Sequence, residues 1–393
     1  KPVEIVTHES VRRRGGGFST CGCWYTDTEF VLKGLQIMCG IAGFVNDMPI
    51  DVKCPVLQRM TDMIAHRGPD SEGHYIDEHA ALGHRRLSII DLGGGQQPIY
   101  NEDGSKVITF NGEIYNYQTL REELIAAGHT FTTKSDTEVL LHGYEQWGVD
   151  LLQRVRGMFT FVIWDKNKQE LFGARDHFGI KPFYYAKMNG TFMYASEIKS
   201  LLRHPDFVKE LNAEALKPYM TFQYPAIGET FFKGVYKLPE GHYFTYRDGK
   251  MDIHRYYDED FREGKQKLGE LVNSIDQTVC DSVKAHQIAD VEVGSFLSSG
   301  VDSSYVAAVA RPQHTYSIGF GKGTYNESQQ AGELAELLKL NNTAESLTDE
   351  EAFAAFPRIQ WHLDEPDSNP SCVPLYFLSA LAAKDVKVVL SGE

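Results

Sequence analysis

The chain has 393 residues, of which 42% are hydrophobic and 24% charged, and its formal net charge at pH 7 is −15. This length allows two or three domains with well-buried cores, whereas the acidic charge argues against a surface for nucleic acid or anionic membranes without excluding ATP. The six cysteines lack the spacing of a disulfide framework and no apolar run approaches the length of a membrane span, so we expect a cytoplasmic protein.

Residues 1–38 are expected to be a leader or an upstream, non-structural segment. They include the basic, Gly-rich run VRRRGGGFST and lack the apolar core of a secretory signal. Cys21 and Cys23 could ligate a metal, but no second ligand pair lies nearby, so this interpretation is not preferred. The stretch GLQIMCGIAGF (34–44) places a Met directly before Cys39 and a short predicted strand. We therefore expect the mature chain to begin at Cys39.

Residues 39–255 form a first predicted domain that is rich in strands. Apolar spacing predicts a helix over 54–68, and a Ser-x-x-Glu capping box opens a second helix over 135–148, which ends at a glycine. Strands are predicted at 82–90, 106–110, 158–165, 170–176, 181–186 and 191–195. Many strands with few crossover helices favour two packed sheets with helices outside.

Residues 256–268 are charged and predict a linker, after which helices and strands alternate through a second domain, residues 269–393. Helices are predicted near 268–287, from 302, and near 328–340, 349–361 and 374–384, and strands near 291–297, 314–320 and 386–390. This alternation is typical of a parallel sheet with helices on both faces. The sequence stops directly after a strand, where such sheets bind ligands, so we expect this domain to be incomplete at its C-terminus.

Cys39 has the chemistry of a nucleophile if it is the first residue. Its free α-amine, with an ordinary pKa of about 7.7–8.0, suits a general base, and its thiol is the attacking group. Asn111 and Gly112 follow the predicted strand KVITF and could stabilise an oxyanion. Arg86 and Asp136 are candidates for binding the carboxylate and the amine of a substrate.

The motifs around these residues resemble a known family. MCGIAGF, HRGPDSEG, GHRRLSIID, QPIYN, NGEIYNY, SDTEV, GMFTFVIWD and ARDHFGIKPFYY occur in the order found in the glutaminase domain of class II glutamine amidotransferases. The resemblance implies a four-layer αββα N-terminal-nucleophile hydrolase with Cys39 as nucleophile. Asn111 and Gly112 would then form the oxyanion hole. The glutamine-binding residues would be Asn111 and Gly112 together with Arg86, Leu87, Ser88, Ile89, Ile90, Glu113 and Asp136.

A second constellation lies in VGSFLSSGVDSS (293–304), where a predicted strand leads through a Ser/Gly loop into a helix. Ser298, Ser299 and Gly300 can present backbone N–H groups to an anion, and Asp302 and Ser303 lie in the first helical turn. The stretch lacks the lysine of a Walker loop, and many ordinary strand-to-helix turns look similar. On its own, it therefore leaves both a phosphate cradle and a structural turn open.

In context, SSGVDSS resembles the PP-loop of ATP pyrophosphatases, with Ser299 in place of a glycine. The resemblance implies an adenine pocket at Leu297 and Ile318, ATP contacts from Ser391 and Gly392, and support of an acyl-adenylate step by Glu393. The whole arrangement resembles the family of glutamine-hydrolysing asparagine synthetases. It implies glutamine, aspartate and ATP with Mg²⁺ as ligands, a Cys39 thioester, β-aspartyl-AMP, a buried ammonia path and a homodimer as a possible assembly. The ligands of the metal stay unassigned.

Two alternatives remain open. A related PP-loop amidotransferase could act on another carboxylate, and an assay of acceptor specificity separates it from the asparagine synthetase. A truncated chain could instead retain glutaminase activity alone, or bind a nucleotide or a partner without turnover. A glutaminase assay without ATP discriminates between these two outcomes.

Overall fold

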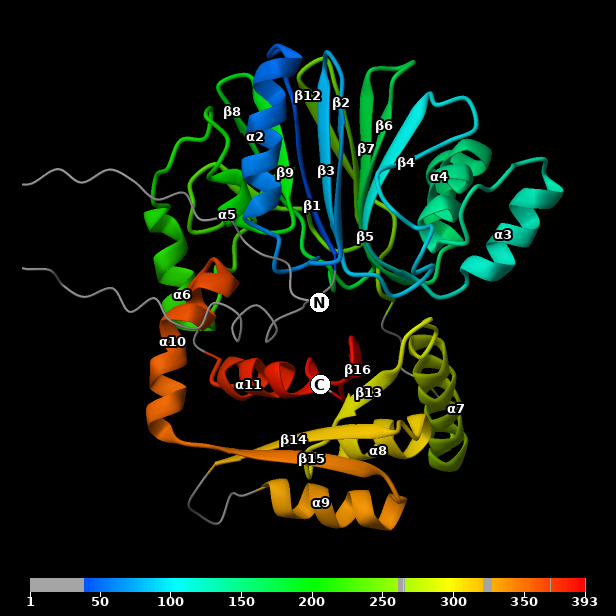
Figure 1. Ribbon diagram of the computed structural model, residues 1–393, viewed down its shortest axis with the longest axis vertical. Coiled ribbons are helices and arrows are strands. Elements are labelled where there is room, and N and C mark those ends of the chain that lie inside the picture. Colours follow the sequence, from blue (N-terminus) through cyan, green and yellow to red (C-terminus); the bar gives the residue numbers. More distant parts are fainter. Residues whose placement is uncertain (1–38, 261–263, 265, 321–326, 368, 393) are drawn as a thin grey trace, which may run out of the picture.

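The computed structural model describes residues 39–260, 264, 266–320, 327–367 and 369–392. The predicted leader, with Cys21 and Cys23, and the predicted catalytic residue Glu393 lie outside these residues. Figure 1 shows two layered parts, a β-sandwich flanked by helices above and a smaller parallel sheet below.

The sandwich consists of two six-stranded antiparallel sheets. The first sheet runs, from edge to edge, through β10 (Val235–Lys237), β8 (Tyr184–Met188), β9 (Thr191–Ala195), β1 (Gly40–Val45), β3 (Ala80–Arg86) and β2 (Ser71–Ile76). The second runs through β12 (Lys250–Arg255), β11 (His242–Arg247), β7 (Glu170–Arg175), β6 (Gly157–Asp165), β5 (Lys106–Ile114) and β4 (Ile99–Tyr100).

Alternating side chains explain why these sheets stack in four layers. In β5, Ile108 and Phe110 pack toward α3 (Tyr117–Ala126) and α4 (Asp136–Trp147), whereas Val107 faces the first sheet. The outer face of the first sheet is covered by α2 (Ile50–Asp62) and α5 (Ile198–Leu201). The predicted αββα arrangement is thereby confirmed. The part is completed by η1 (Gly148–Gln153), η2 (Ala213–Ala215) and α6 (Leu216–Phe222).

Several predicted boundaries in this part are wrong. The helix predicted over 54–68 is α2, which begins at Ile50 and accommodates Pro55 one turn in. The strand predicted over 82–90 ends at Arg86, because the chain turns where the Ser88 N–H donates to the Asp70 carboxylate. Helix α3 was not predicted, since its apolar residues contribute only two buried side chains.

The predicted capping box of α4 forms only in part. Ser135 is the N-cap, and its hydroxyl accepts from the backbone N–H of Thr137. Glu138 turns away from the cap, and its carboxylate accepts hydrogen bonds from the backbone N–H groups of Thr132 and Thr133. The loop preceding α4 is therefore fastened to the first turn of the helix.

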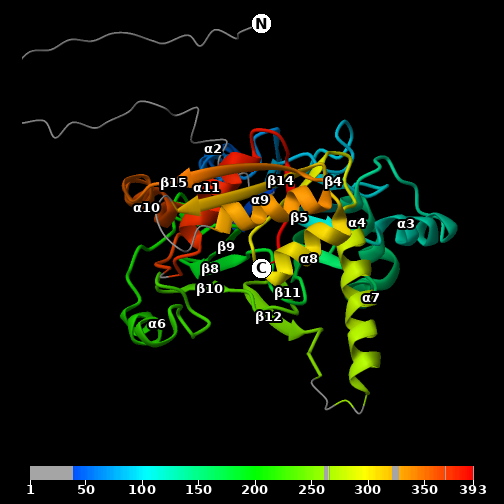
Figure 2. The ribbon, with the colours of Figure 1, turned by 90° about the horizontal axis from the view of Figure 1, so that it is seen from below.

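The second part contains the predicted parallel sheet, in the order β15 (Asn341–Leu347), β14 (His314–Phe320), β13 (Val293–Phe296) and β16 (Val388–Leu390). The polar strand β15 was not predicted, because its sequence NNTAESL lacks an apolar run. Its helices are α7 (Leu268–His286), α8 (Val301–Ala310), α9 (Glu327–Leu338), α10 (Asp349–Leu363) and α11 (Cys372–Ala382). Helices α8 and α9 pack on one face of the sheet and α11 on the other (Figure 2).

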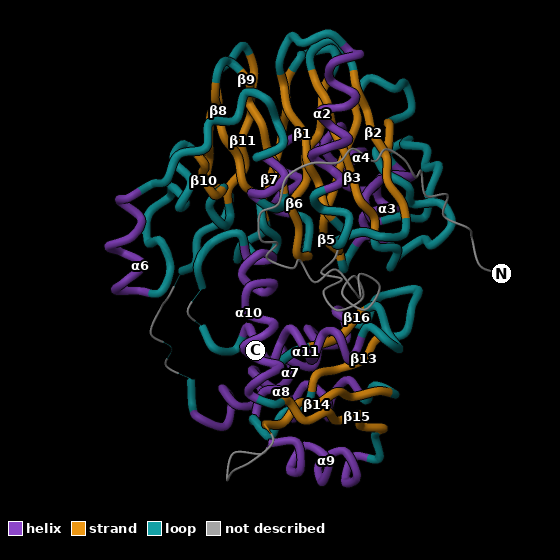
Figure 3. The backbone as a smooth tube through the Cα atoms, turned by 60° about the vertical axis from the view of Figure 1, so that its left-hand side comes forward, coloured by secondary structure: helices purple, strands orange, loops and turns teal. Residues whose placement is uncertain are grey.

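The two parts are joined by polar contacts. The Asp290 N–H donates to the Ile89 carbonyl at 2.9 Å, while the Asp290 carboxylate accepts from the Asp91 N–H at 2.7 Å. At the other side, the end of α10 reaches the sandwich (Figure 3), where Asp364 forms an ion pair of 2.9 Å with Lys199. Across the described ranges, no helix combines the length and apolar character needed to cross a bilayer.

Candidate active sites

A small cavity of about 20 Å³ opens beside Cys39, between the two sheets at the start of β1. Most of the residues predicted to bind glutamine line it. These are Cys39, Arg86, Leu87, Ile89, Ile90, Gly112, Glu113 and Asp136. Ser88 and Asn111 are not among the lining residues. The structure thus brings together side chains from β1, β3, β5 and the start of α4.

The Cys39 side chain is one wall of this cavity. Its Sγ donates to the Leu87 carbonyl oxygen at 3.6 Å, and the Cys39 carbonyl accepts from Arg67 Nε at 3.1 Å. Burial raises the pKa of the thiol to about 11, so it is protonated near neutral pH and needs a base before it can attack. None of the described residues that line the cavity is a histidine.

Asn111 and Gly112 lie within β5 and not after its end as predicted, because the strand continues its pairing with β6 through Ile114. The Asn111 side chain is fully buried, and neither its Oδ1 nor its Nδ2 has a hydrogen-bond partner among the described residues. An unpaired buried amide is costly. Because Asn111 alternates with Phe110, it lies on the same strand face as Glu113, toward the Cys39 sheet.

Gly112 is required by its surroundings. A Cβ atom at this position would lie 2.2 Å from the Met158 carbonyl oxygen of β6. A side chain here would force the two strands apart. The backbone of Gly112 can therefore line the cavity only as glycine.

The charged residues of the cavity are held in place by backbone groups. Arg86 Nη2 donates to the carbonyl oxygens of Ile90, at 3.0 Å, and Asp91, at 2.7 Å. Burial raises the pKa of Asp136 to about 6, and Asp136 Oδ2 accepts from the Ile114 N–H at 2.9 Å. Burial, together with the charge of Asp136, raises the pKa of Glu113 well above its ordinary value. Burial therefore disfavours the ionised form of both carboxyl groups, and that of Glu113 is disfavoured further by the charge of Asp136.

Sequence reasoning missed several residues of this cavity. Gly95, Gln97, Phe110, Ser135 and Thr137 also line it. A Cβ at Gly95 would lie 2.7 Å from Arg86 Nη2, so this glycine leaves room for the guanidinium. The run GGGQQP between two predicted strands was the available signal.

A second cavity, of about 470 Å³, opens at the C-terminal ends of β13, β14 and β16. The lining residues that were predicted to bind ATP are Leu297, Ser298, Gly300, Asp302, Ser303, Ile318, Ser391 and Gly392. Ser299 is not a lining residue. Phe296, Phe320, Ser371, Pro374, Leu375 and Leu378 line the cavity and were not predicted. The unpredicted residues are mostly apolar and come from α11 and the strand ends, where no motif marks them.

The Ser/Gly loop is fixed by its own hydroxyl groups. The Ser298 and Ser303 hydroxyls lie 2.7 Å apart, and Ser298 Oγ accepts from the Gly300 N–H at 3.1 Å. Ser299 does not adopt a positive φ, so a serine is accommodated where the PP-loop motif has glycine. The first helical turn of α8 follows directly, with Asp302 as the carboxylate beside the loop. A loop next to a helix N-terminus suits a phosphate, and a carboxylate suits its Mg²⁺.

An apolar cluster lies between the two cavities. Leu87, Ile89 and Ile90 of the first cavity form its buried core, and Cys39 packs against it. From the second part, the cluster receives Ile288, Ala289, Val291 and Val388. The apolar residues that line the first cavity therefore also contact the part of the chain that contains β13 and β16, the strands that lead to the second cavity.

Another cavity, of about 870 Å³, lies elsewhere, between the end of α2 and helices α10 and α11. It is lined by residues such as His66, Arg358 and Trp361. None of the predicted site residues lines it, so its size does not bear on the chemistry of the other two cavities.

Comparisons with known proteins identify two family models that match different parts of this chain. Residues 38–257 match the family model described as a glutamine amidotransferase domain, and residues 274–393 match the model described as asparagine synthase. The Bacillus subtilis protein named asparagine synthetase [glutamine-hydrolyzing] 1 is 43% identical over 91% of this chain and 57% of its own length. A Methanocaldococcus jannaschii protein with a provisional form of that name is 33% identical over 91% of this chain and 74% of its own.

A Gibberella zeae protein named Amidase chry2 is 31% identical over 91% of this chain and 58% of its own length. Among solved structures, the glutamine phosphoribosylpyrophosphate amidotransferase of B. subtilis aligns with a TM-score of 0.42 and 15% identity, over 78% of this chain and 65% of that chain. The chain thus spans less than two thirds of the length of the first B. subtilis relative.

Proposed function

This chain belongs to the family of glutamine-hydrolysing asparagine synthetases, and we propose that it releases ammonia from glutamine at Cys39 and transfers it to aspartate at the Ser298–Ser303 cavity. The observation that carries the proposal is the pair of cavities, each lined by the residues of its own motif and separated by one apolar cluster. The residue roles, the domain limits (39–255, 256–268 and 269–393) and the cytoplasmic location belong to the same proposal.

In the first half-reaction, the α-amine of Cys39, freed by removal of the preceding residues, takes the thiol proton. Sγ attacks the side-chain carbonyl carbon of glutamine, and Asn111 and Gly112 stabilise the oxyanion. Collapse of this intermediate breaks the C–N bond, and the proton leaves with ammonia. Water then hydrolyses the thioester to glutamate and restores the thiol. The buried, unpaired Asn111 amide and the buried thiol that needs a base both support these roles.

Substrate glutamine presents a carboxylate and an ammonium group to the cavity. Arg86 would bind the carboxylate, and the acidic pair Glu113 and Asp136 would bind the ammonium. The carbonyl contacts of Arg86 Nη2 fix the guanidinium without neutralising it. Charge complementarity therefore favours a zwitterionic amino acid.

In the second half-reaction, the aspartate side-chain carboxylate attacks the α-phosphorus of ATP, which forms β-aspartyl-AMP and releases pyrophosphate. Ser298, Gly300 and Ser303 would hold the phosphates, and Asp302 would hold Mg²⁺, which supplies charge neutralisation when bound. Ammonia then attacks the acyl carbon and displaces AMP, giving asparagine. The apolar cluster supports a dry route, because ammonia must stay unprotonated to attack.

The experiment that tests the first half-reaction compares chains that begin at Lys1 and at Cys39. Glutamate formation without ATP should occur only in the chain that begins at Cys39, and Cys39→Ala should abolish it. Cys54→Ala, at an exposed cysteine of α2, is the matched control and should keep full activity. Equal activity of the two chains would contradict the role of the amine.

A second candidate is amide transfer to a different carboxylate. The relative from G. zeae, which bears the name of an amidase, motivates this alternative. If the chain makes asparagine, release of pyrophosphate from ATP in the presence of glutamine should require aspartate. Release of pyrophosphate with a different carboxylic acid, and none with aspartate, would favour amide transfer to that acid.

A further inference from the structure

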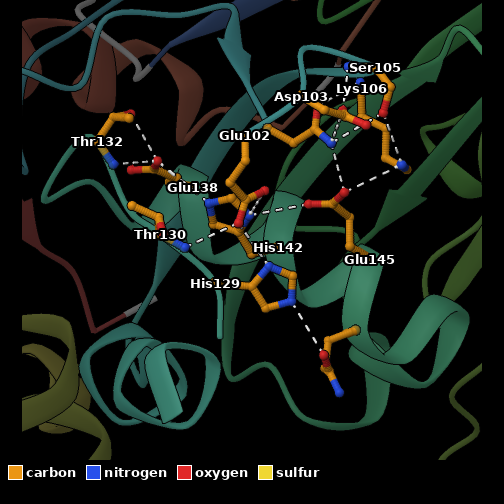
Figure 4. A network of polar contacts seen from close by, with 12 residues as sticks. Glu102, Asp103, Ser105, Lys106, His129, Thr130, Thr132, Glu138, His142 and Glu145 are labelled. Carbon is orange, nitrogen blue, oxygen red and sulfur yellow. Dashed lines mark hydrogen bonds and ion pairs between the residues drawn. The ribbon is translucent and has the colours of Figure 1, made fainter. Parts of the chain in front are cut away.

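Four side chains with metal-binding chemistry meet beside α4 (Figure 4), and none of them lines either of the two cavities. Glu102 follows β4, His129 lies in the loop after α3, and His142 and Glu145 lie on successive turns of one face of α4. One ligand atom from each of these residues lies within 4.8 Å of all the others. Three separate chain segments therefore converge on one point.

The separations between these atoms match a four-coordinate site. Glu102 Oε1 lies 3.1 Å from His129 Nδ1, and Glu102 Oε2 lies 3.3 Å from His142 Nδ1. Glu145 Oε2 lies 3.2 Å from His142 Nδ1. Tetrahedral ligands bound to Zn²⁺ at about 2.0–2.1 Å are separated from one another by about 3.3 Å. The ligand atoms can thus bind one ion with small movements.

The far side of each imidazole ring faces a side-chain oxygen. His129 Nε2 lies within hydrogen-bond distance of the Gln146 side-chain oxygen, at 3.3 Å, whereas His142 Nε2 lies 3.6 Å from Glu138 Oε1, beyond hydrogen-bond distance. In metal sites, the second ring nitrogen of a ligating histidine donates to such an oxygen, which leaves the first nitrogen as the ligand. Both histidines present the same atom, Nδ1, to the centre of the cluster.

The carboxylates are oriented in the same way. Glu145 Oε1 accepts from Asn101 Nδ2 at 2.7 Å and from Lys106 Nζ at 3.4 Å, which leaves Oε2 directed at His142. Glu102 Oε1 accepts from the Thr130 N–H at 3.1 Å. Outer hydrogen bonds thus orient Glu102, His129 and Glu145, as the partners of metal ligands do in known sites.

We propose that Glu102, His129, His142 and Glu145 bind one divalent transition-metal ion of the Zn²⁺ class. Two imidazoles with two carboxylates suit Zn²⁺, whereas Mg²⁺ and Ca²⁺ prefer oxygen ligands alone. The rival interpretation is a metal-free network in which protonated histidines pair with the glutamates.

The ion would tie together segments that support the first cavity. His142 lies on α4, whose first residue is Asp136, and His129 lies in the loop that leads to that residue. Glu138 already fastens Thr132 and Thr133 of this loop to the helix. A bound metal adds a cross-link further along the same loop, so its role is structural and is independent of the chemistry at Cys39.

The test uses the full chain after treatment with a chelator. Titration calorimetry with Zn²⁺ should give one equivalent per chain, and Co²⁺ should give the visible absorption of a four-coordinate ion. His129→Gln and Glu102→Gln, both at side chains that are only partly exposed, should each weaken binding roughly 100-fold. Gln146→Ala, which removes only an outer contact, should weaken it about tenfold. His79→Gln is the matched control, since His79 also pairs with a carboxylate, Asp47 at 3.3 Å, outside the cluster.

The proposal is supported if the unsubstituted chain binds Zn²⁺, if His129→Gln and Glu102→Gln each weaken this binding, and if His79→Gln does not. Absence of a binding isotherm for the original chain overturns it in favour of the metal-free network. Equal binding by the cluster variants and the original chain also overturns it, since the ion then sits elsewhere. Because neither variant alters the Cys39 cavity, the result does not depend on amidotransferase activity.

Discussion

The raised pKa of Asp136 predicts that glutamine binding weakens as the pH falls through 6. Burial raises this pKa to about 6, so above it the carboxylate is ionised and attracts the glutamine ammonium group, and below it the group is neutral. Glutamine itself keeps its zwitterionic charges between pH 5 and pH 7. The pH dependence therefore reports the protein.

The expected magnitude follows from the fraction of Asp136 that is ionised. With a pKa of about 6, this fraction is roughly 0.9 at pH 7 and roughly 0.1 at pH 5. If only the ionised form binds glutamine, the association constant falls about tenfold between these two pH values, which corresponds to about 1.4 kcal/mol. A carboxyl group with an ordinary pKa near 3.9 would give almost no change over the same range.

Calorimetric titration of glutamine into the Cys39→Ala chain measures this binding without turnover. Asp136→Asn should bind weakly and lose the pH dependence. Glu113→Gln should keep the midpoint near pH 6, because burial, and not the neighbouring Glu113, is the main cause of the raised pKa of Asp136. A midpoint that persists in Asp136→Asn, or that moves in Glu113→Gln, would refute the assignment of the titration to Asp136.

Three further substitutions test the remaining parts of the structure. Gly392→Ala places a Cβ 2.3 Å from the Ser303 backbone nitrogen, so ATP binding, measured by calorimetry, should be lost while glutaminase activity is kept. Retention of ATP binding would show that close packing of residue 392 against Ser303 is not needed. Gly112→Ala should separate β5 from β6 and abolish glutaminase activity together with a large drop in melting temperature. Trp164→Phe removes, at a fully buried position, the indole N–H that donates to the Asp77 carboxylate at 2.7 Å. Urea unfolding should show that the free energy of unfolding falls by about 2–3 kcal/mol, and an unchanged midpoint would mean that this hydrogen bond contributes no net stability.

The sequence predicted the layers because their signals are local and strongly periodic. The apolar, aromatic-rich runs of β6 and β9 and the Ser135 cap of α4 depend on residues adjacent in the chain, and these predictions are confirmed. The parallel sheet likewise followed from alternating helices and strands. Motif resemblance then directed attention to Cys39 and to the Ser/Gly loop.

The features that were missed or placed wrongly depend on contacts between segments that are distant in the chain, and local sequence patterns do not encode such contacts. Asn111 was expected beyond the end of a strand, but its position inside β5 is decided by pairing with β6, almost fifty residues away. The polar strand β15 forms only because β14 lies beside it. Gln97 reaches the first cavity by bonding the backbone of Phe110, a contact that no local pattern encodes.

The clasp between Asp290 and the loop at Ile89 and Asp91 also sets a limit on the separation of the two cavities. From Asp290, only eight residues of chain lead through β13 to Ser298. At about 3.3–3.6 Å per residue, this tether spans at most about 29 Å, roughly the diameter of a small domain. The Ser/Gly loop therefore cannot move farther than this from Asp290 and from the loop that carries Ile89 of the first cavity while these two hydrogen bonds hold.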